Sequence, residues 1–396
     1  MGTRGRFLWR QLHLWLGLSL GALFVLLGLT GSVLAFYPEI DAALHPEIRP
    51  EIRVMAQQGH APDWASPVWD RALATVRAQW PDKDGPWRFE ATGKAGAIPA
   101  RYYNPPERAG RMFAPMMVWL SPDGAEVLRR DYWGDYAMTW IYDLHQQLLA
   151  EALGKALVGW SGLAMLMLLA SGLIVWWPRG SWRKALAFKR DAMALRRLRD
   201  IHKLGGLASF ALLFILVATG VLLALPEERD RVMAATIGPV DAIPMAMTMK
   251  AGGDVAHSLP PGPQISIAQA LAAAHRALPD GRLAWIEVPG RNSGLFKIRV
   301  QVPGDPSFRF PHSYVHVDQR SGRVLGVYDA RRMGAASTIN GWLHPLHDAS
   351  IGGMPTRLLA VVAGLVPLLL FTTGLLHWLR RRRARGNAVG RRAATR

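Results

Sequence analysis

The sequence predicts a membrane α-helical fold, with four transmembrane helices arranged as two parallel pseudo-repeats and two external α+β domains. Three observations lead to this prediction. Half of the 396 residues are hydrophobic, and they gather in four runs long enough to cross a bilayer. The positive charge gathers beside the ends of those runs. Each half of the chain has the same order of a span, an external segment and a second span, and histidines occur at matching positions in the two halves.

The four apolar runs comprise residues 12–37, 156–177, 204–225 and 358–379, and each has about the 20 residues that a membrane span needs. We do not expect the first run to be a cleaved signal peptide, because it is too long and no small-residue cleavage site precedes Pro38 and Glu39. The runs divide the chain into eight predicted segments: 1–37 (first span), 38–152 (first external domain), 153–177 (second span), 178–200 (basic loop), 201–225 (third span), 226–352 (second external domain), 353–379 (fourth span) and 380–396 (basic tail).

The charge distribution predicts the orientation of the spans. Nearly all of the net charge of +18 lies in residues 1–11, 178–200 and 380–396, which flank the spans on one side. The positive-inside rule therefore places both termini in the cytoplasm. A nucleic-acid-binding protein would spread such charge over a folded surface, so we expect no nucleic-acid partner. Only the tail Arg380–Arg385 leaves open binding to nucleic acid or to anionic membrane lipid.

The chain contains no cysteine, which excludes disulfides, iron–sulfur clusters, thiolate zinc sites and covalently attached haem. Histidine is then the strongest metal ligand available. The sequence also lacks P-loop, GxSxG and HExxH motifs, and no flavin or nicotinamide site is evident. The alternating residues Met245, Met247 and Met249 would suit Cu(I), although such a run is more often an apolar strand or a membrane-facing lip.

The two external segments share one plan, a helix followed by a hairpin sheet. In the first, the pattern predicts a helix over residues 70–79 and a hairpin over residues 116–129. In the second, it predicts a helix over residues 267–278, strands over 285–288 and 296–302, and a hairpin over 314–328. Their histidines follow no ligand spacing and are expected at the surface: His45, His60, His257, His275, His312 and His316.

Two offsets relate the spans of the two halves. An offset of 189 residues superposes Arg10 and His13 on Arg199 and His202. The same offset takes Thr30 and Gly31 to Thr219 and Gly220. An offset of 202 residues takes His145 to His347, and Gly172 to Gly374. The halves therefore run in the same direction, and a cofactor between them would receive one ligand from each half.

Histidines at the span ends are the candidate ligands, because ionisable residues in spans are costly and usually functional. The repeat pairs His13 with His202 at the inner edge, and His145 with His347 at the outer edge. Each pair could ligate one haem iron between facing helices. His377 has no counterpart in the repeat and is either an alternative inner ligand or a packing residue.

Other residues in and beside the spans fit a haem pocket, although each also has a simpler role. Arg10 and Arg199 lie three residues before the inner histidines and could pair with haem propionates. Small and aromatic residues could admit and line a macrocycle, or could serve only helix packing: Gly17, Gly21, Gly28, Gly31, Gly205, Gly206, Gly220, Trp15, Phe24, Phe210, Phe214 and Trp378. A single interfacial histidine is often only an amphipathic anchor, and the pairing in both halves argues against that interpretation.

These motifs resemble the PepSY-associated transmembrane helix family. The resemblance rests on Arg10 with His13, Arg199 with His202, His145 and His347, and it covers roughly residues 7–380. It implies that the external domains are periplasmic PepSY-like modules. The size and four-span plan look most like inner-membrane ferric-siderophore reductases of the ferrioxamine type.

That resemblance implies an enzyme with two haem b groups, held by His13, His202, His145 and His347, in a bacterial inner membrane. Electrons from an unknown cytoplasmic donor would cross to the periplasm and reduce a ferric siderophore, which binds ferrous iron poorly. Aromatic residues near the outer face could contact the substrate, or form an interfacial belt: Trp133, Tyr136, Trp140, Tyr142 and Trp342. The alternative is a non-enzymatic transporter, or an assembly or inhibitor module. A transporter is expected to have broken spans or midplane charges.

Overall fold

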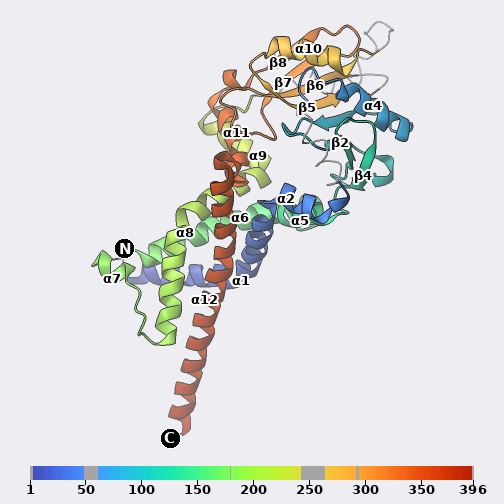
Figure 1. Ribbon diagram of the computed structural model, residues 1–396. Helices are drawn as coiled ribbons and strands as arrows, with labels where there is room; N and C mark the ends of the chain where they lie inside the picture. Colours follow the sequence, from blue (N-terminus) through green and yellow to red (C-terminus); the bar gives the residue numbers. More distant parts are fainter. Residues whose placement is uncertain (1–2, 49–60, 179, 242–263, 291–293, 395–396) are drawn as a thin grey trace. The chain divides into compact units, whose positions relative to one another are not determined.

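The computed structural model describes residues 3–48, 61–178, 180–241, 264–290 and 294–394 (Figure 1). The chain divides into two compact units, and each unit draws on distant parts of the sequence. The helical unit consists of Met1–Phe36, Ile141–Pro226 and Leu346–Arg396. The sheet unit consists of Tyr37–Trp140 and Glu227–Pro345. The apolar runs thus gather in one unit, and most of the two external segments in the other.

Four helices of the helical unit are long and apolar enough to cross a membrane: α1 (Thr3–Leu34), α6 (Glu151–Trp176), α8 (Ala194–Ala224) and α12 (Gly353–Ala394). They confirm the four spans predicted from the sequence. Helices α1 and α8 each pack against both α6 and α12. A Cβ atom on Gly28 would lie only 2.4 Å from the carbonyl oxygen of Gly364. Glycine is therefore needed there because the backbones of α1 and α12 come into direct contact.

Two short helices lead into the second and fourth spans, α5 (Ala137–Gln147) into α6 and α11 (Ala335–His347) into α12. His145 lies near the end of α5, and His347 ends α11. A left-handed backbone costs roughly 1–2 kcal/mol for a residue with a side chain, so it marks an enforced turn. Residues with a left-handed backbone follow both helices: Leu148 and Leu149 follow α5, and Ala349 follows α11. Each of these histidines therefore sits on a short helix of its own, separated by a turn from the span that follows.

The remaining short elements connect these helices and the sheet: α2 (Tyr37–Leu44), η1 (Pro46–Ile48), η2 (Pro106–Arg108), α7 (Trp182–Leu186), α9 (Pro226–Thr236), η5 (Ala330–Arg332) and η6 (Ser350–Gly352).

The sheet unit contains one antiparallel sheet of eight strands in the order β4-β3-β2-β1-β5-β6-β7-β8. The first external segment contributes β1 (Trp87–Glu90), β2 (Ile98–Tyr102), β3 (Met116–Leu120) and β4 (Val127–Tyr132). The second contributes β5 (Arg282–Val288), β6 (Leu295–Gln301), β7 (Ser313–Asp318) and β8 (Val324–Tyr328). The predicted hairpins correspond to β3-β4 and β7-β8, whereas β1 and β2 were not predicted from the sequence.

The predicted separation into two external domains is wrong, because strand β1 pairs with strand β5 and joins the two segments. The register places Trp87 opposite Val288 and Phe89 opposite Ile286. Two small four-stranded sheets would each leave an open edge at this position, and each would bury only a small core. Pairing the two edges removes both of them and combines the apolar residues into one shared core.

That core lies between the sheet and two helices, α4 (Val68–Gln79) and α10 (Ile267–Ala277). Figure 1 shows α10 lying along the strands of the second segment. The two helices are also tied together, because the carboxylate of Asp70 accepts hydrogen bonds from the backbone N–H groups of Ile267 (2.7 Å) and Ala268 (3.1 Å). A carboxylate from α4 thus caps the start of α10. The largest fully buried side chains of the core are Trp69, Trp87, Phe89, Phe296, Met116 and Leu120.

One prediction about the external histidines is wrong. His316 lies in β7 between Lys297 and Gly326 of the neighbouring strands, and only 2% of its surface is exposed. Its place in the middle of a strand decides its burial, and no ligand-spacing argument could reveal that. The methionine run Met245, Met247 and Met249 lies outside the described residues, as do His60 and His257.

A candidate cofactor site built from four histidines

The structure brings the four repeat-related histidines together in the pairs that the two offsets predict. His13 of α1 faces His202 of α8, and the centroids of the two rings are 6.1 Å apart. His145 of α5 faces His347 of α11, and these centroids are also 6.1 Å apart. The rings are perpendicular in the first pair and inclined by 40° in the second. Each pair takes one histidine from each half of the chain, and all four belong to the helical unit.

The ring atom Nδ1 of each histidine in the first pair is hydrogen-bonded to a neighbouring span. Nδ1 of His13 lies 3.2 Å from the carbonyl oxygen of Leu168 and 3.0 Å from Oγ of Ser171, both on α6. Nδ1 of His202 lies 2.9 Å from the carbonyl oxygen of Leu370 and 3.1 Å from Oγ1 of Thr373, both on α12. The two partner sets are related by the offset of 202 residues.

The second pair repeats this arrangement on the other two spans. Nδ1 of His145 lies 2.9 Å from Oγ1 of Thr30 on α1. Nδ1 of His347 lies 3.3 Å from Oγ1 of Thr219 and 2.9 Å from the carbonyl oxygen of Leu216, both on α8. Thr30 and Thr219 are related by the offset of 189 residues. Every histidine of the site is therefore oriented by a serine or threonine from a neighbouring span.

The hydroxyl groups also determine which ring nitrogen carries the proton. The hydroxyl of Thr30 donates to the carbonyl oxygen of Leu26 in its own helix (2.8 Å), and that of Thr219 donates to Ile215 (2.7 Å). Ser171 and Thr373 donate to carbonyl oxygens in the same way. A hydroxyl has one proton to donate, so toward the histidine it acts as an acceptor. Nδ1 is then the donor, and Nε2 is the ring nitrogen that could ligate a metal ion.

A glycine adjoins each of the four rings. An ideal Cβ would lie 3.0 Å from Cε1 of His145 at Gly31 and 2.8 Å from Cε1 of His347 at Gly220. It would lie 3.0 Å from Cε1 of His13 at Gly172 and 3.4 Å from Cε1 of His202 at Gly374. Carbon atoms prefer a separation of about 3.5–4.0 Å, so a Cβ at Gly220 would displace the ring of His347, and one at Gly31 or Gly172 would require the neighbouring ring to move by a few tenths of an ångström. The glycines allow Cε1 of each ring to approach the neighbouring helix closely.

The geometry fits a group that takes two imidazole ligands. Two imidazoles bound to one metal ion at about 2 Å place their ring centroids roughly 6 Å apart, which is the separation in both pairs. Within the described parts of the chain, no cluster of three or more His, Cys, Asp or Glu side chains could enclose a metal ion. A site with two protein ligands suits haem, in which the macrocycle supplies the remaining ligands of the iron.

The two pairs lie near opposite ends of the spans. His13 and Gly31, which adjoins His145, are 18 residues apart on α1. At 1.5 Å per residue this corresponds to about 27 Å along the helix, close to the roughly 30 Å of a hydrocarbon core. His202 and Gly220, which adjoins His347, have the same spacing on α8. The helical unit thus carries one histidine pair near each end of its long apolar helices.

The other predicted site residues, Arg10, Arg199 and His377, lie near the His13–His202 pair but are not part of it. The guanidinium of Arg10 lies over the ring of Phe7 (5.5 Å), and the residue is exposed. The side chain of Arg199 is 61% exposed and lies 3.9 Å from the carboxylate of Asp200. His377 on α12 is close enough to His202 to affect it electrostatically. Both arginines can therefore reach an anionic group outside the protein core.

The residues predicted to line a pocket take different positions. Phe24 is buried, whereas Trp15 and Phe214 are exposed on the outside of the helical unit. Phe210 stacks on Phe214 with 6.1 Å between the ring centroids. Gly28 serves contact between helices, whereas Gly31 adjoins a histidine ring. The small residues thus divide between contacts with a neighbouring helix, as at Gly28, and contacts with a histidine ring, as at Gly31.

The aromatic residues predicted near the substrate do not behave as a set. Trp133 and Tyr136 are buried inside the sheet unit, whereas Trp140 and Trp342 are exposed. The hydroxyl groups of Tyr136 and Tyr37 are 2.9 Å apart, and burial raises the pKa of Tyr136. Tyr136 is therefore a buried structural residue.

In the sequence, Thr30 and Thr219 stand out only as markers of the repeat, and Ser171 and Thr373 do not stand out. Their function is visible only where the helices meet. A signal was present in the sequence, because Ser171 and Thr373 are separated by the same 202 residues as His145 and His347. A polar residue beside a glycine at matching positions of both halves marks each histidine contact.

Comparison with known proteins agrees with this architecture. The profile of the PepSY-associated TM region matches residues 10–381, which include all four spans, both histidine pairs and the sheet unit. No curated protein matches the chain significantly. The match and the four apolar helices indicate a multi-pass membrane protein. The chain belongs to the PepSY-associated TM region family.

Proposed function

We propose that this protein is a di-haem reductase of the bacterial inner membrane, which passes electrons across the bilayer to reduce a ferric siderophore in the periplasm. The observation that carries this proposal is the pair of facing imidazoles near each end of the spans, with 6.1 Å between the ring centroids in both. When bound, two haem b groups at these positions would supply single-electron transfer between the two membrane surfaces.

The chain's own residues prepare both sites for such a group. Ser171 and Thr373 orient the rings of His13 and His202, and Thr30 and Thr219 orient those of His145 and His347. Each ring is neutral because Nδ1 keeps the only ring proton, and Nε2 is the nitrogen that would bind the group. A neutral imidazole is also the form that a membrane interior tolerates.

The arginines beside the first pair suit the charged edge of a haem. Arg10 and Arg199 each lie three residues before a histidine of that pair, and both are exposed. They would pair with propionate groups at the basic end of the spans. His377 is the only further histidine on a span, so it is the alternative ligand at that end of the protein.

The topology follows from the charge. Because the basic segments 1–11, 178–200 and 380–396 flank one end of the spans, we propose that both termini are cytoplasmic and that the sheet unit is periplasmic. The His13–His202 pair would then be the inner site, which receives electrons from a cytoplasmic donor. The His145–His347 pair would be the outer site, beside the substrate. Reduction releases iron because the hard oxygen ligands of a siderophore bind ferrous iron much less tightly than ferric iron.

The continuity of three spans and the positions of the histidines argue against a transporter, although the fourth span, α12, contains Pro367. Helices α1, α6 and α8 run without interruption over 32, 26 and 31 residues, and the paired histidines lie at the ends of the spans rather than at their middle. Transporters of this size typically bind their substrate at the midplane, beside broken helices.

The experiment that tests the proposal is a count of haem in the purified protein. Pyridine haemochrome analysis should give about two haems per chain, and acid–acetone should extract both because no cysteine is present to attach them. A folded preparation from haem-replete cells that contains no haem would overturn the proposal.

A further inference from the structure

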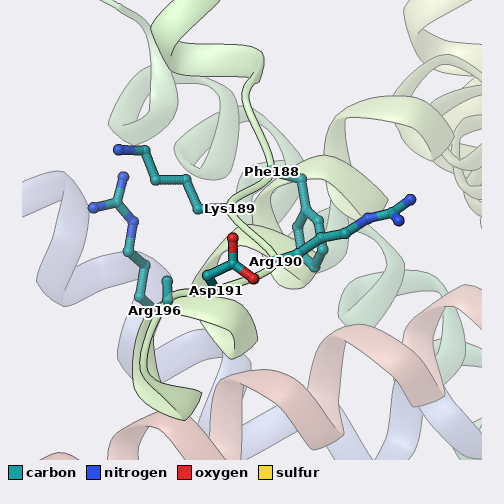
Figure 2. A pocket seen from close by; sticks show the side chains of 6 residues that line it. Phe188, Lys189, Arg190, Asp191 and Arg196 are labelled. Carbon is teal, nitrogen blue, oxygen red and sulfur yellow. The ribbon is translucent and has the colours of Figure 1, made fainter.

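The segment that connects α6 to α8 forms an open pocket with a volume of about 680 Å³. Three of its lining residues are cations and one is an acid: Phe188, Lys189, Arg190, Asp191, Ala192 and Arg196. Figure 2 shows the side chains of Lys189 and Arg196 extending toward the same side, whereas Arg190 extends the other way. The pocket therefore has a surplus of positive charge, and two of its cations converge.

The cationic side chains of the pocket make few hydrogen bonds or ion pairs with the described residues. Among the described residues, the side chains of Lys189 and Arg190 take part in no hydrogen bond or ion pair. Within the described ranges, the side chain of Arg196 approaches one acid, Asp200, at 3.8 Å. Lys203 differs, because its ammonium group donates to the carbonyl oxygen of Ala187 (3.3 Å) and fastens the segment to α8. The charges of Lys189 and Arg196 are thus available to a ligand from outside the chain.

The same segment exposes large apolar side chains. Trp182 is 50% exposed, Leu186 45%, Phe188 43% and Met193 83%. The ring of Trp182 also packs against Trp176 at the end of α6, with 5.5 Å between the centroids. Tryptophan at the end of a span is typical of the headgroup level of a bilayer, and apolar side chains among cations are typical of interfacial segments. The segment therefore has the composition of chain that lies in the membrane surface.

We propose that residues 180–193 lie in the headgroup layer and that this pocket binds the phosphate of an anionic phospholipid. Lys189 and Arg196 bind the phosphate oxygens, and Phe188 packs against the carbon atoms below the headgroup. A lipid is favoured over a soluble phosphate compound because the exposed Trp182 and Met193 hold the pocket where headgroups are concentrated. This site is separate from both histidine pairs, and it requires only that the chain spans a membrane.

The charge balance of the pocket selects the class of lipid. Asp191 opposes three cations, so a positive surplus remains for a headgroup with net negative charge. A zwitterionic headgroup brings its own cation and gains less from this surplus. The expected ligand is therefore a lipid such as phosphatidylglycerol rather than phosphatidylcholine.

The test titrates the purified full-length protein in detergent with phosphatidylglycerol or phosphatidylcholine and measures bound lipid by native mass spectrometry. The wild-type protein should bind phosphatidylglycerol more tightly. Each cation near an anionic surface is worth about fivefold in affinity, so the double variant Lys189→Gln, Arg196→Gln should bind it about 25-fold more weakly. The matched control, Arg183→Gln with Lys184→Gln, removes the same charge from the same segment outside the pocket. It should weaken binding by less than about fivefold.

A charge-conserving variant separates binding from folding. Lys189→Arg with Arg196→Lys should bind phosphatidylglycerol as the wild type does, and should unfold at the same temperature. Equal loss of binding in the two glutamine double variants would show only diffuse attraction and would overturn the proposal. Equal binding of the two lipids by the wild type would overturn it as well. So would displacement of phosphatidylglycerol by millimolar inorganic phosphate, because the pocket would then prefer a soluble anion.

Discussion

Replacement of Gly220 by alanine should abolish one histidine site and leave the other intact. A Cβ on Gly220 would lie 2.8 Å from Cε1 and 3.3 Å from Nδ1 of His347. Carbon atoms in contact need about 3.5 Å or more, so the ring must retreat by about 0.7 Å. A ligand site tolerates displacements of only about 0.5 Å. His347 would then no longer lie opposite His145 at the distance that one metal ion spans.

Gly374→Ala is the matched control. The Cβ of this variant would lie 3.4 Å from Cε1 of His202, so a shift of about 0.1 Å is sufficient. Both glycines lie inside long helices, α8 and α12, and alanine by itself favours each helix by about 1 kcal/mol. The difference between Gly220→Ala and Gly374→Ala therefore isolates the contact with the histidine ring.

The assay combines haem content with the low-spin signal of a bis-histidine iron in electron paramagnetic resonance. Gly220→Ala should contain about one haem fewer than the wild type, whereas Gly374→Ala should keep the full complement. Thermal unfolding of the haem-free proteins shows whether the helices still pack. The reasoning is refuted if Gly220→Ala retains both sites, or if Gly374→Ala loses as much haem as Gly220→Ala.

Three further predictions address the pairing, the topology and the sheet unit. His145→Ala and His347→Ala should each perturb the same single haem in redox-titrated spectra, because both rings face one position; damage to different haems contradicts the pairing. Reporter fusions after Gly96 and after Gly304 should be active only as periplasmic reporters, and cytoplasmic activity at either site would overturn the topology. Burial and the nearby Lys297 lower the pKa of His316 to about 4, whereas the unfolded chain binds this proton near pH 6.5. The free energy of unfolding should therefore fall as pH drops from about 6.5 to 4, and thermal unfolding of His316→Gln should be less sensitive to acid than that of the wild type. An equal loss in both proteins would show that His316 is not the group responsible.

The sequence by itself determined the spans and the identity of the paired histidines. A span is a local property, because about 20 consecutive apolar residues are needed to cross the bilayer wherever the rest of the chain lies. The histidine pairs could be predicted because two copies of one helix–histidine unit keep the same spacing, as His13 and His202 show. The structure then places the two rings of each pair opposite one another.

The environment of those histidines was only partly visible in the sequence. The +189 offset marks Thr30 and Thr219, but a conserved offset cannot show that a hydroxyl on one span meets a ring on another. Ser171 and Thr373 acquire their role only where α6 and α12 pack against α1 and α8. The sequence also could not show which glycines contact a neighbouring helix, as Gly28 does, and which contact a histidine ring. That depends on where the helices cross.

The architecture outside the spans was decided by tertiary structure. Composition and turn signals predicted α4, α10 and the hairpins, but treated the two external segments as separate domains. The pairing of Trp87 with Val288 joins residues about 200 positions apart, and no local pattern encodes it. The burial of His316 has the same origin, since it depends on strands that lie on both sides of β7. Local periodicity specifies which residues form a strand, whereas only the assembled sheet specifies which edges meet and which side chains they enclose.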